Sequence, residues 1–158
     1  MKIKTLALIS LFMSSIVLLT TWPIFPLFQG YLNFGDVFVM GMGLVVGWPY
    51  AVLAGVGAAL ADILLGYAQY AVFTLVIKGL EALLIAWVIH RRASVPLWVY
   101  GLAGLWMAVG YGLADVLISM NLQIFMVSFG YNLLQGLIAA SLAYSVQPLL
   151  LRLKKNFN

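Results

Sequence analysis

The sequence predicts an all-α integral membrane protein, with six transmembrane helices in a single domain (1–158). Three observations carry this prediction. Hydrophobic residues make up 65% of the 158 residues and charged residues only 8%, which is too apolar for a water-soluble domain of this size. The apolar residues form long runs separated by short polar or proline-containing segments. The lysines and arginines lie almost wholly at the ends of these runs, as they do beside membrane spans.

The first apolar run, residues 5–21, follows two lysines and predicts the first helix. It is long for the apolar part of a signal peptide, and no small-x-small cleavage site follows it, so we expect it to be retained. The connection 22–36 contains two prolines and several aromatic residues. Because it is apolar for a loop, we expect it to pack against the helices as a lid.

Residues 37–65 can be read as one helix that is longer than a bilayer requires, or as two shorter ones. Pro49, which follows Gly47 and Trp48, favours two helices, because proline removes a donor and restricts the residue before it. The first of these two is then shorter than a usual span. The helices expected after the first therefore cover residues 37–46, 51–65, 71–89, 97–118 and 123–151.

Charge placement favours six crossings over five. With six, the N-terminal lysines, Arg91 and Arg92, and the basic C-terminal segment all lie on one side of the membrane. With five, Arg91, Arg92 and the C-terminus would lie opposite the N-terminal lysines. Because basic residues gather on the cytoplasmic side, we expect six helices with cytoplasmic N- and C-termini.

Ionisable side chains within apolar runs are costly in lipid, so they usually face a bundle interior and mark a site. On this topology, Asp62 and Asp115 lie near the outer ends of the third and fifth helices. Lys78 and Glu81 lie about 10–15 Å deeper on the fourth, given the rise per residue. They can form a structural ion pair, but one lysine cannot balance three carboxylates, which favours a wet, ligand-sized cavity.

The candidate ligand-binding residues are polar and aromatic side chains expected in the outer half of the bundle. One of them, Asp36, can instead cap the second helix. Tyrosine rings at the outer ends can sandwich a flat heterocycle or belong to an interfacial aromatic belt. The full set is Asn33, Asp36, Asp62, Tyr67, Tyr70, Lys78, Glu81, Asp115, Tyr131, Asn132 and Gln135.

A weak internal repeat fits the same geometry. Residues 60–64 (LADIL) are echoed by 113–117 (LADVL), and residues 78–80 (KGL) by 135–137 (QGL). The repeat predicts two similar helical hairpins, although chance matches are common in a chain so rich in leucine and alanine.

Catalytic and metal-binding patterns are absent from the sequence. There is no cysteine, a single histidine (His90) and no phosphate-binding loop. We therefore expect no enzymatic activity, no cofactor and no metal site. Energy for uphill transport would have to come from another chain or from an ion gradient.

Several of these segments resemble the substrate-binding S components of energy-coupling factor (ECF) vitamin transporters. The similar segments are NFGD at 33–36, GWP at 47–49, AALADIL at 58–64, GY at 66–67 and TLVIKGLE at 74–81. The similarity is greatest to the group of riboflavin, hydroxymethylpyrimidine and pyridoxine S components.

The resemblance implies a ligand and a set of partners. S components bind a vitamin in the outer half of the bundle and topple in the bacterial cytoplasmic membrane to release it inside. They work with a transmembrane T component and two cytoplasmic ATPases. A small neutral aromatic heterocycle is expected as ligand, with hydroxymethylpyrimidine and pyridoxine favoured. The docking pattern on the family's first helix, Ala-xxx-Ala, corresponds here to Ser10 and Ser14, with Ala7 on nearly the same face.

Two other classes of function stay open at this point. One is a membrane scaffold protein, which needs no ligand. The other is a small secondary transporter driven by protons through Asp62, Glu81 or Asp115.

Overall fold

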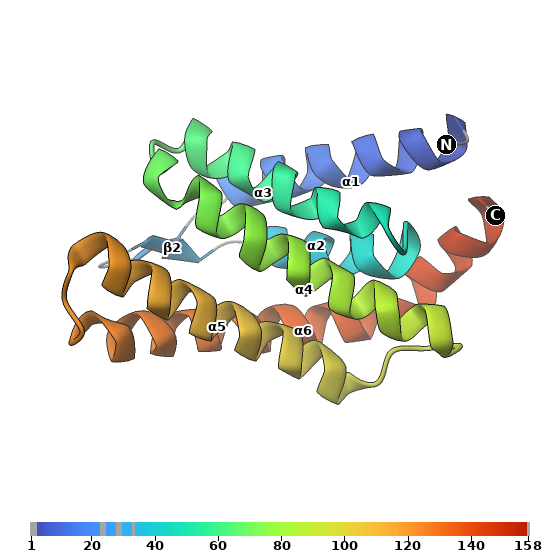
Figure 1. Ribbon diagram of the computed structural model, residues 1–158. Helices are drawn as coiled ribbons and strands as arrows, with labels where there is room; N and C mark the ends of the chain where they lie inside the picture. The colour runs from blue at the N-terminus through green and yellow to red at the C-terminus, as the bar shows by residue number, and fades with distance from the viewer. Residues whose placement is uncertain (1–2, 23–24, 28–29, 33, 158) are drawn as a thin grey trace.

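A computed structural model describes residues 3–22, 25–27, 30–32 and 34–157 (Figure 1). The described residues form six α-helices and one two-stranded hairpin. The expected helical architecture is confirmed, and the hairpin lies in the connection for which we expected only a loop. The bounds are α1 Ile3–Thr21, β1 Phe25–Leu27, β2 Gly30–Leu32, α2 Gly35–Val45, η1 Tyr50–Val52, α3 Leu53–Leu64, η2 Ala68–Tyr70, α4 Ala71–Arg91, α5 Leu97–Ser119 and α6 Ile124–Phe157.

Successive helices run in alternating directions through the bundle (Figure 1). Both chain ends therefore lie at one end of the bundle, which we call the terminal end. The β1–β2 hairpin, η2 and the turn between α5 and α6 lie at the opposite end, which we call the hairpin end. The strands are antiparallel, with Phe25 opposite Leu32 and Leu27 opposite Gly30.

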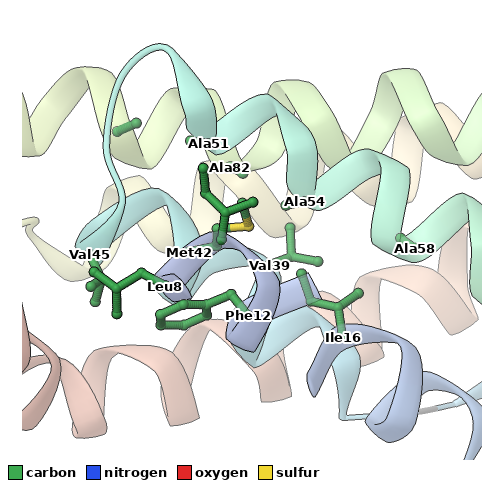
Figure 2. Close-up of a cluster of buried hydrophobic side chains, with 12 residues drawn as sticks. Leu8, Phe12, Ile16, Val39, Met42, Val45, Ala51, Ala54, Ala58 and Ala82 are labelled. Carbon is green, nitrogen blue, oxygen red and sulfur yellow. The ribbon is translucent and has the colours of Figure 1, made fainter. Parts of the chain in front are cut away.

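The short helix α2 forms the centre of the bundle. Nine of its eleven residues are buried, and it packs against α1, α3, α4 and α6. One face joins a cluster with α1 that includes Phe12 and Ile16, and with alanines of α3 and α4 (Figure 2). The other face, through Met40 and Leu44, joins a second cluster with α4, α5 and α6. Close van der Waals packing of these side chains holds the two halves of the bundle together, as it does between membrane helices.

The predicted break between the second and third helices is confirmed. α2 ends at Val45, and Gly47 adopts a positive φ of 76°, a conformation that glycine adopts at little cost. Pro49 then precedes η1, and α3 runs back toward the hairpin end.

Two helical hairpins are closed by backbone-to-backbone contacts at glycines. A Cβ on Gly104 of α5 would lie 2.8 Å from the carbonyl oxygen of Gly136 on α6. A Cβ on Gly55 of α3 would likewise lie 2.8 Å from the nitrogen of Gly79 on α4. Small residues at these crossings let membrane helices approach closely, so α3 with α4 and α5 with α6 form tight pairs.

Four helical segments of the described chain are long and apolar enough to cross a membrane: Ile3–Thr21, Ala68–Arg91, Leu97–Ser119 and Ile124–Asn156. α2 and the segment Tyr50–Leu64 are apolar but shorter. Large apolar side chains cover the outside of the bundle, including Leu64 and Leu117 at about 60% exposure. This surface suits contact with lipid and identifies a membrane protein.

Candidate functional site

Every acidic side chain of the protein is buried inside the bundle. The chain has four, one each on α2, α3, α4 and α5. Their exposed fractions are 3% for Asp36, 6% for Asp62, 0% for Glu81 and 4% for Asp115. One buried cation, Lys78, accompanies them among the described residues. Burial of a charge is costly unless it is paired and hydrogen-bonded, so the partners of these groups define the site.

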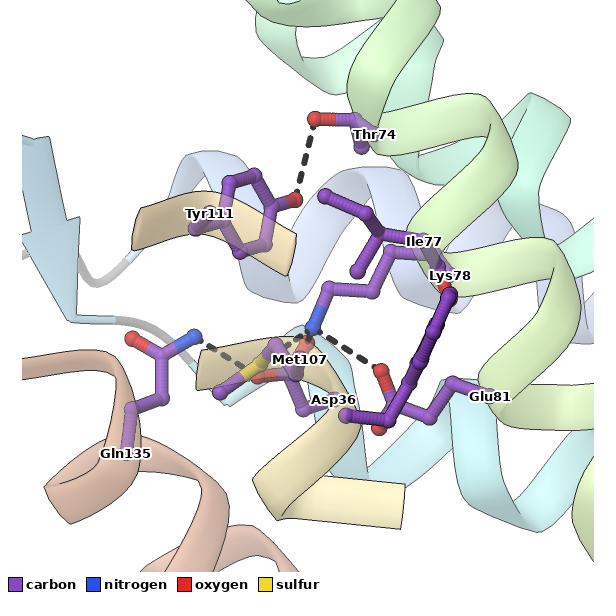
Figure 3. Close-up of polar contacts among 9 residues, drawn as sticks. Asp36, Thr74, Ile77, Lys78, Glu81, Met107, Tyr111 and Gln135 are labelled. Carbon is purple, nitrogen blue, oxygen red and sulfur yellow. Dashed lines mark hydrogen bonds and ion pairs between the residues drawn. The ribbon is translucent and has the colours of Figure 1, made fainter. Parts of the chain in front are cut away.

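Lys78 of α4 lies at the centre of the polar interior (Figure 3). Its Nζ forms one ion pair with Asp36 Oδ1 on α2 and another, of 3.2 Å, with Glu81 Oε2 one turn further along α4. On the other side of Asp36, Gln135 Nε2 of α6 donates a hydrogen bond of 2.6 Å to Oδ2. The Asp36 carboxylate thus joins three helices through its two oxygens.

The side chains that complete this cluster come from α5 and from the preceding turn of α4. Met107 Sδ lies 2.6 Å from Lys78 Nζ, and the Tyr111 ring lies with its centroid 5.5 Å from the same nitrogen. The Tyr111 hydroxyl is 2.9 Å from Thr74 Oγ1. We call the seven residues the Lys78 cluster: Asp36, Thr74, Lys78, Glu81, Met107, Tyr111 and Gln135.

A second group of polar side chains lies nearer the hairpin end. The Tyr70 hydroxyl donates a hydrogen bond to Asp115 Oδ1, which ties the start of α4 to the end of α5. The rings of Tyr67 and Tyr70 pack edge to face, with centroids 6.3 Å apart. The backbone N–H of Tyr67 donates to the carbonyl of Asp62 across the α3–α4 turn. These contacts lie on the side of the Lys78 cluster that faces the hairpin end.

The helical period explains why these residues meet. Thr74 and Lys78 are four residues apart on α4, and Met107, Tyr111 and Asp115 recur every four residues on α5. Residues at this spacing share one face of a helix. Both faces turn inward, so the polar ladders of α4 and α5 oppose one another beside Asp36.

The expected internal repeat has a counterpart in burial. Asp62 and Asp115 are both buried near the ends of their helices, while Leu64 and Leu117 are both exposed. Lys78 and Gln135, the two polar residues of the second repeated motif, bind opposite oxygens of Asp36.

Some residues named from the sequence are placed apart from this cluster. Asn132 donates to the carbonyl and the hydroxyl of Ser128 on its own helix, at 2.9 and 3.2 Å. Tyr131 is 38% exposed, on the outer side of α6. Asn33 lies outside the described residues.

The capping interpretation of Asp36 is wrong. α2 starts at Gly35, its N-cap is Phe34, and no side chain caps it. The Asp36 carboxylate turns into the bundle instead, because Lys78 and Gln135 offer it a cation and a donor there.

The candidate set predicted from the sequence did not include Thr74, Met107 or Tyr111. The available signal was their position one or two helical turns from Lys78 or Asp115 on the same helix. Among the described residues, no group of three or more His, Asp or Glu side chains is placed to hold a metal ion.

The expected docking residues lie on the outside of α1. Ala7, Ser10 and Ser14 are all exposed, whereas Phe12 and Ile16 point into the core. This face of α1 is therefore open to lipid or to another membrane subunit.

Comparison with known proteins identifies the family. A family model described as the S component of the ECF-type riboflavin transporter matches residues 1–155. A Pyrococcus woesei protein described as an uncharacterized protein in a gap 3′ region is 42% identical over 89 residues, which are 54% of this chain and 60% of that protein. The resemblance seen in the sequence is thus confirmed. The chain belongs to the family of ECF-type riboflavin transporter S components.

Proposed function

We propose that the protein binds a small aromatic vitamin or vitamin precursor, with hydroxymethylpyrimidine or pyridoxine favoured, and carries it across the membrane as the S component of an ECF importer. The observation that carries the proposal is the Lys78 cluster. A fully buried ion network that joins α2, α4 and α6 is costly in a membrane protein and usually marks a functional site.

The chemistry of the cluster suits these two ligands. Hydroxymethylpyrimidine and pyridoxine carry hydroxyl groups and ring nitrogens, which can bond to the carboxylates and to the amide of Gln135. Their flat rings suit Tyr111 of the cluster and the nearby Tyr67 and Tyr70, because aromatic rings stack at offset or edge-to-face geometry. Asp62 and Asp115 provide further acceptors on the side of the hairpin end.

The same proposal includes six crossings, with both termini in the cytoplasm of a bacterium. Two features support it. The helices alternate in direction, and the basic residues at helix ends, such as Arg91, Arg152 and Lys155, belong to the terminal end (Figure 1). Cytoplasmic ends of membrane helices carry an excess of lysine and arginine. The hairpin end, with the Tyr70–Asp115 contact, then faces outside.

The proposed partners are a transmembrane T component and two cytoplasmic ATPases. The support is the exposed face of α1 with Ala7, Ser10 and Ser14, because small residues allow a helix of another subunit to approach closely.

Ligand binding is the direct test. The protein is purified without added vitamin, and hydroxymethylpyrimidine, pyridoxine and riboflavin are titrated by calorimetry. We expect one of the first two to bind with submicromolar affinity, and Lys78→Ala and Asp62→Ala to abolish its binding. Ser141→Ala is the control, since that hydroxyl is exposed and, within the part of the chain that the structure describes, bonds only to the Leu137 carbonyl of its own helix. Folded wild-type protein that binds no member of the panel would rule the proposal out.

A further inference from the structure

The buried charges of this protein do not balance. Four buried carboxylates face one buried ammonium group among the described residues, which gives the interior a formal charge of −3. Within the Lys78 cluster itself, Asp36 and Glu81 share one lysine, so the formal charge there is −1. An isolated charge in a low-dielectric interior is strongly unfavourable, so the excess negative charge of this cluster is removed either by a proton on a carboxylate or by a bound cation.

The unfilled bonding capacity lies on one atom of the cluster. Asp36 is bonded through both oxygens, to Lys78 and to Gln135. Glu81 bonds to Lys78 through Oε2 alone, and its Oε1 is buried without a hydrogen-bond partner among the described residues. Glu81 is 0% exposed, so bulk water does not reach this oxygen. A buried acceptor of this kind costs stability until a donor binds it.

The position of Glu81 relative to Lys78 and the tyrosines decides whether a ligand can contact it. It lies one turn beyond Lys78 on the same inward face of α4 (Figure 3). The aromatic side chains that are suited to a flat ring, Tyr111 and Tyr70, lie on the hairpin side of Lys78. A ligand held against these rings can extend a ring nitrogen or an amine toward the carboxylates.

We propose that the ligand is bound as a monocation, a protonated nitrogen heterocycle or ring-borne amine, and that Glu81 Oε1 accepts the hydrogen bond of its charged N–H group. This inference rests on the proposed function and narrows its substrate class. It replaces the neutral heterocycle expected from the sequence and disfavours a neutral flavin. The bound cation brings the charge of the cluster to zero, and a charge-assisted bond is about twice as strong as a neutral one.

Two pairs of ligands that differ mainly in charge test this assignment. Pyridoxamine carries an ammonium group where pyridoxine carries a hydroxyl, and hydroxymethylpyrimidine carries a basic aminopyrimidine where its 4-oxo analogue is neutral. We expect the cationic or basic member of at least one pair to bind the wild-type protein about tenfold or more tightly than its neutral partner, as a hydrogen bond between charged groups predicts.

The variant Glu81→Gln keeps the shape of the side chain and removes its charge. It leaves Lys78 and Asp36 as a balanced pair, so we expect it to fold and to melt no lower than the wild type. In this variant the preference for the cationic ligand should fall to about twofold or less, because the carboxylate charge that attracts the cation is gone. Ser141→Ala, on the exposed face of α6, should keep the full preference.

The outcomes separate the two proposals. If no probe binds to folded protein, the proposed function fails and this inference fails with it. If riboflavin or the neutral members bind as tightly as the cationic ones, or if Glu81→Gln leaves the preference unchanged, vitamin binding stands and the assignment of Glu81 is overturned.

Discussion

Gln135 of α6 donates a hydrogen bond of 2.6 Å to the buried Asp36 carboxylate of α2, across 99 residues of sequence. Both side chains are less than 10% exposed. The bond therefore ties the first turn of α2 to the first half of α6.

Replacing Gln135 with leucine removes this donor. We expect the free energy of unfolding to fall by about 1–3 kcal/mol, because a buried charged acceptor loses one of its bonds. The melting temperature in detergent measures this loss. It should drop by several degrees, at about 2–4 °C per kcal/mol for a protein of this size. Ser141→Ala provides the control, and an unchanged melting temperature of Gln135→Leu would show that this bond does not stabilise the bundle.

Lys78 is the residue whose loss should destabilise the bundle most. Lys78→Met leaves Asp36 and Glu81 buried without a cation, and we expect a cost of about 3–5 kcal/mol. The triple variant with Asp36→Asn and Glu81→Gln added removes both carboxylates, so most of the stability should return. Thermal melts of the single and triple variants measure the difference. Equal stability of Lys78→Met and the wild type would contradict the ion-pair network.

The contact between α5 and α6 at Gly104 and Gly136 leaves no space for a methyl group. In Gly104→Ala the new Cβ would meet the Gly136 carbonyl oxygen at 2.8 Å, so the helices must separate. We expect the free energy of unfolding to fall by about 1–3 kcal/mol, as for other overpacked interiors.

Gly101→Ala is the matched control one turn earlier, where no atom lies within 4 Å of the added Cβ. Alanine there should be neutral or gain up to about 1 kcal/mol through helix propensity. Similar melting temperatures for both variants would argue against the close crossing.

A bulky substitution on the exposed face of α1 should prevent assembly with the T component and leave ligand binding intact. We expect Ser10→Trp to abolish co-purification of a T component, because a large side chain blocks close helix approach. The affinity for the vitamin should stay within about twofold of the wild type, since residue 10 is exposed and outside the Lys78 cluster. Val72→Trp, which adds the same bulk at a 71% exposed position of α4, is the control. Assembly that survives in Ser10→Trp would move the docking surface elsewhere.

The absence of cysteine makes the topology directly testable by labelling. A cysteine at Leu122, which is 77% exposed between α5 and α6, should react with an impermeant maleimide added to intact cells. A cysteine at Ser94, in the exposed turn between α4 and α5, should react only after the membrane is opened. The reverse labelling pattern would place the chain termini outside the cell.

The sequence predicted most helix bounds to within a few residues, because glycine, proline and the changes in polarity mark the helix ends. Pro49 separated α2 from α3, and the spacing of Lys78 and Glu81 gave their pairing directly. The hairpin was missed because each strand has only three residues and β1 contains Pro26, which argues against a strand.

The partners of Asp36 could not be predicted from local patterns. Periodicity shows which face of a helix is polar, but it does not show which helices lie side by side. Asp36 meets Lys78 and Gln135 only because α2 packs between α4 and α6. For the same reason, the sequence could not show that Asn132 uses its amide on Ser128 of its own helix.

The size and position of α2 have a consequence for how the protein is made. Its eleven residues extend about 16 Å, roughly half the thickness of the hydrocarbon layer. Its first turn carries the acidic side chain of Asp36, whose counter-ion among the described residues is Lys78 on α4, a helix synthesised later. We therefore expect α2 to insert poorly into a bilayer on its own, and to integrate together with α4, which brings the cation that Asp36 needs.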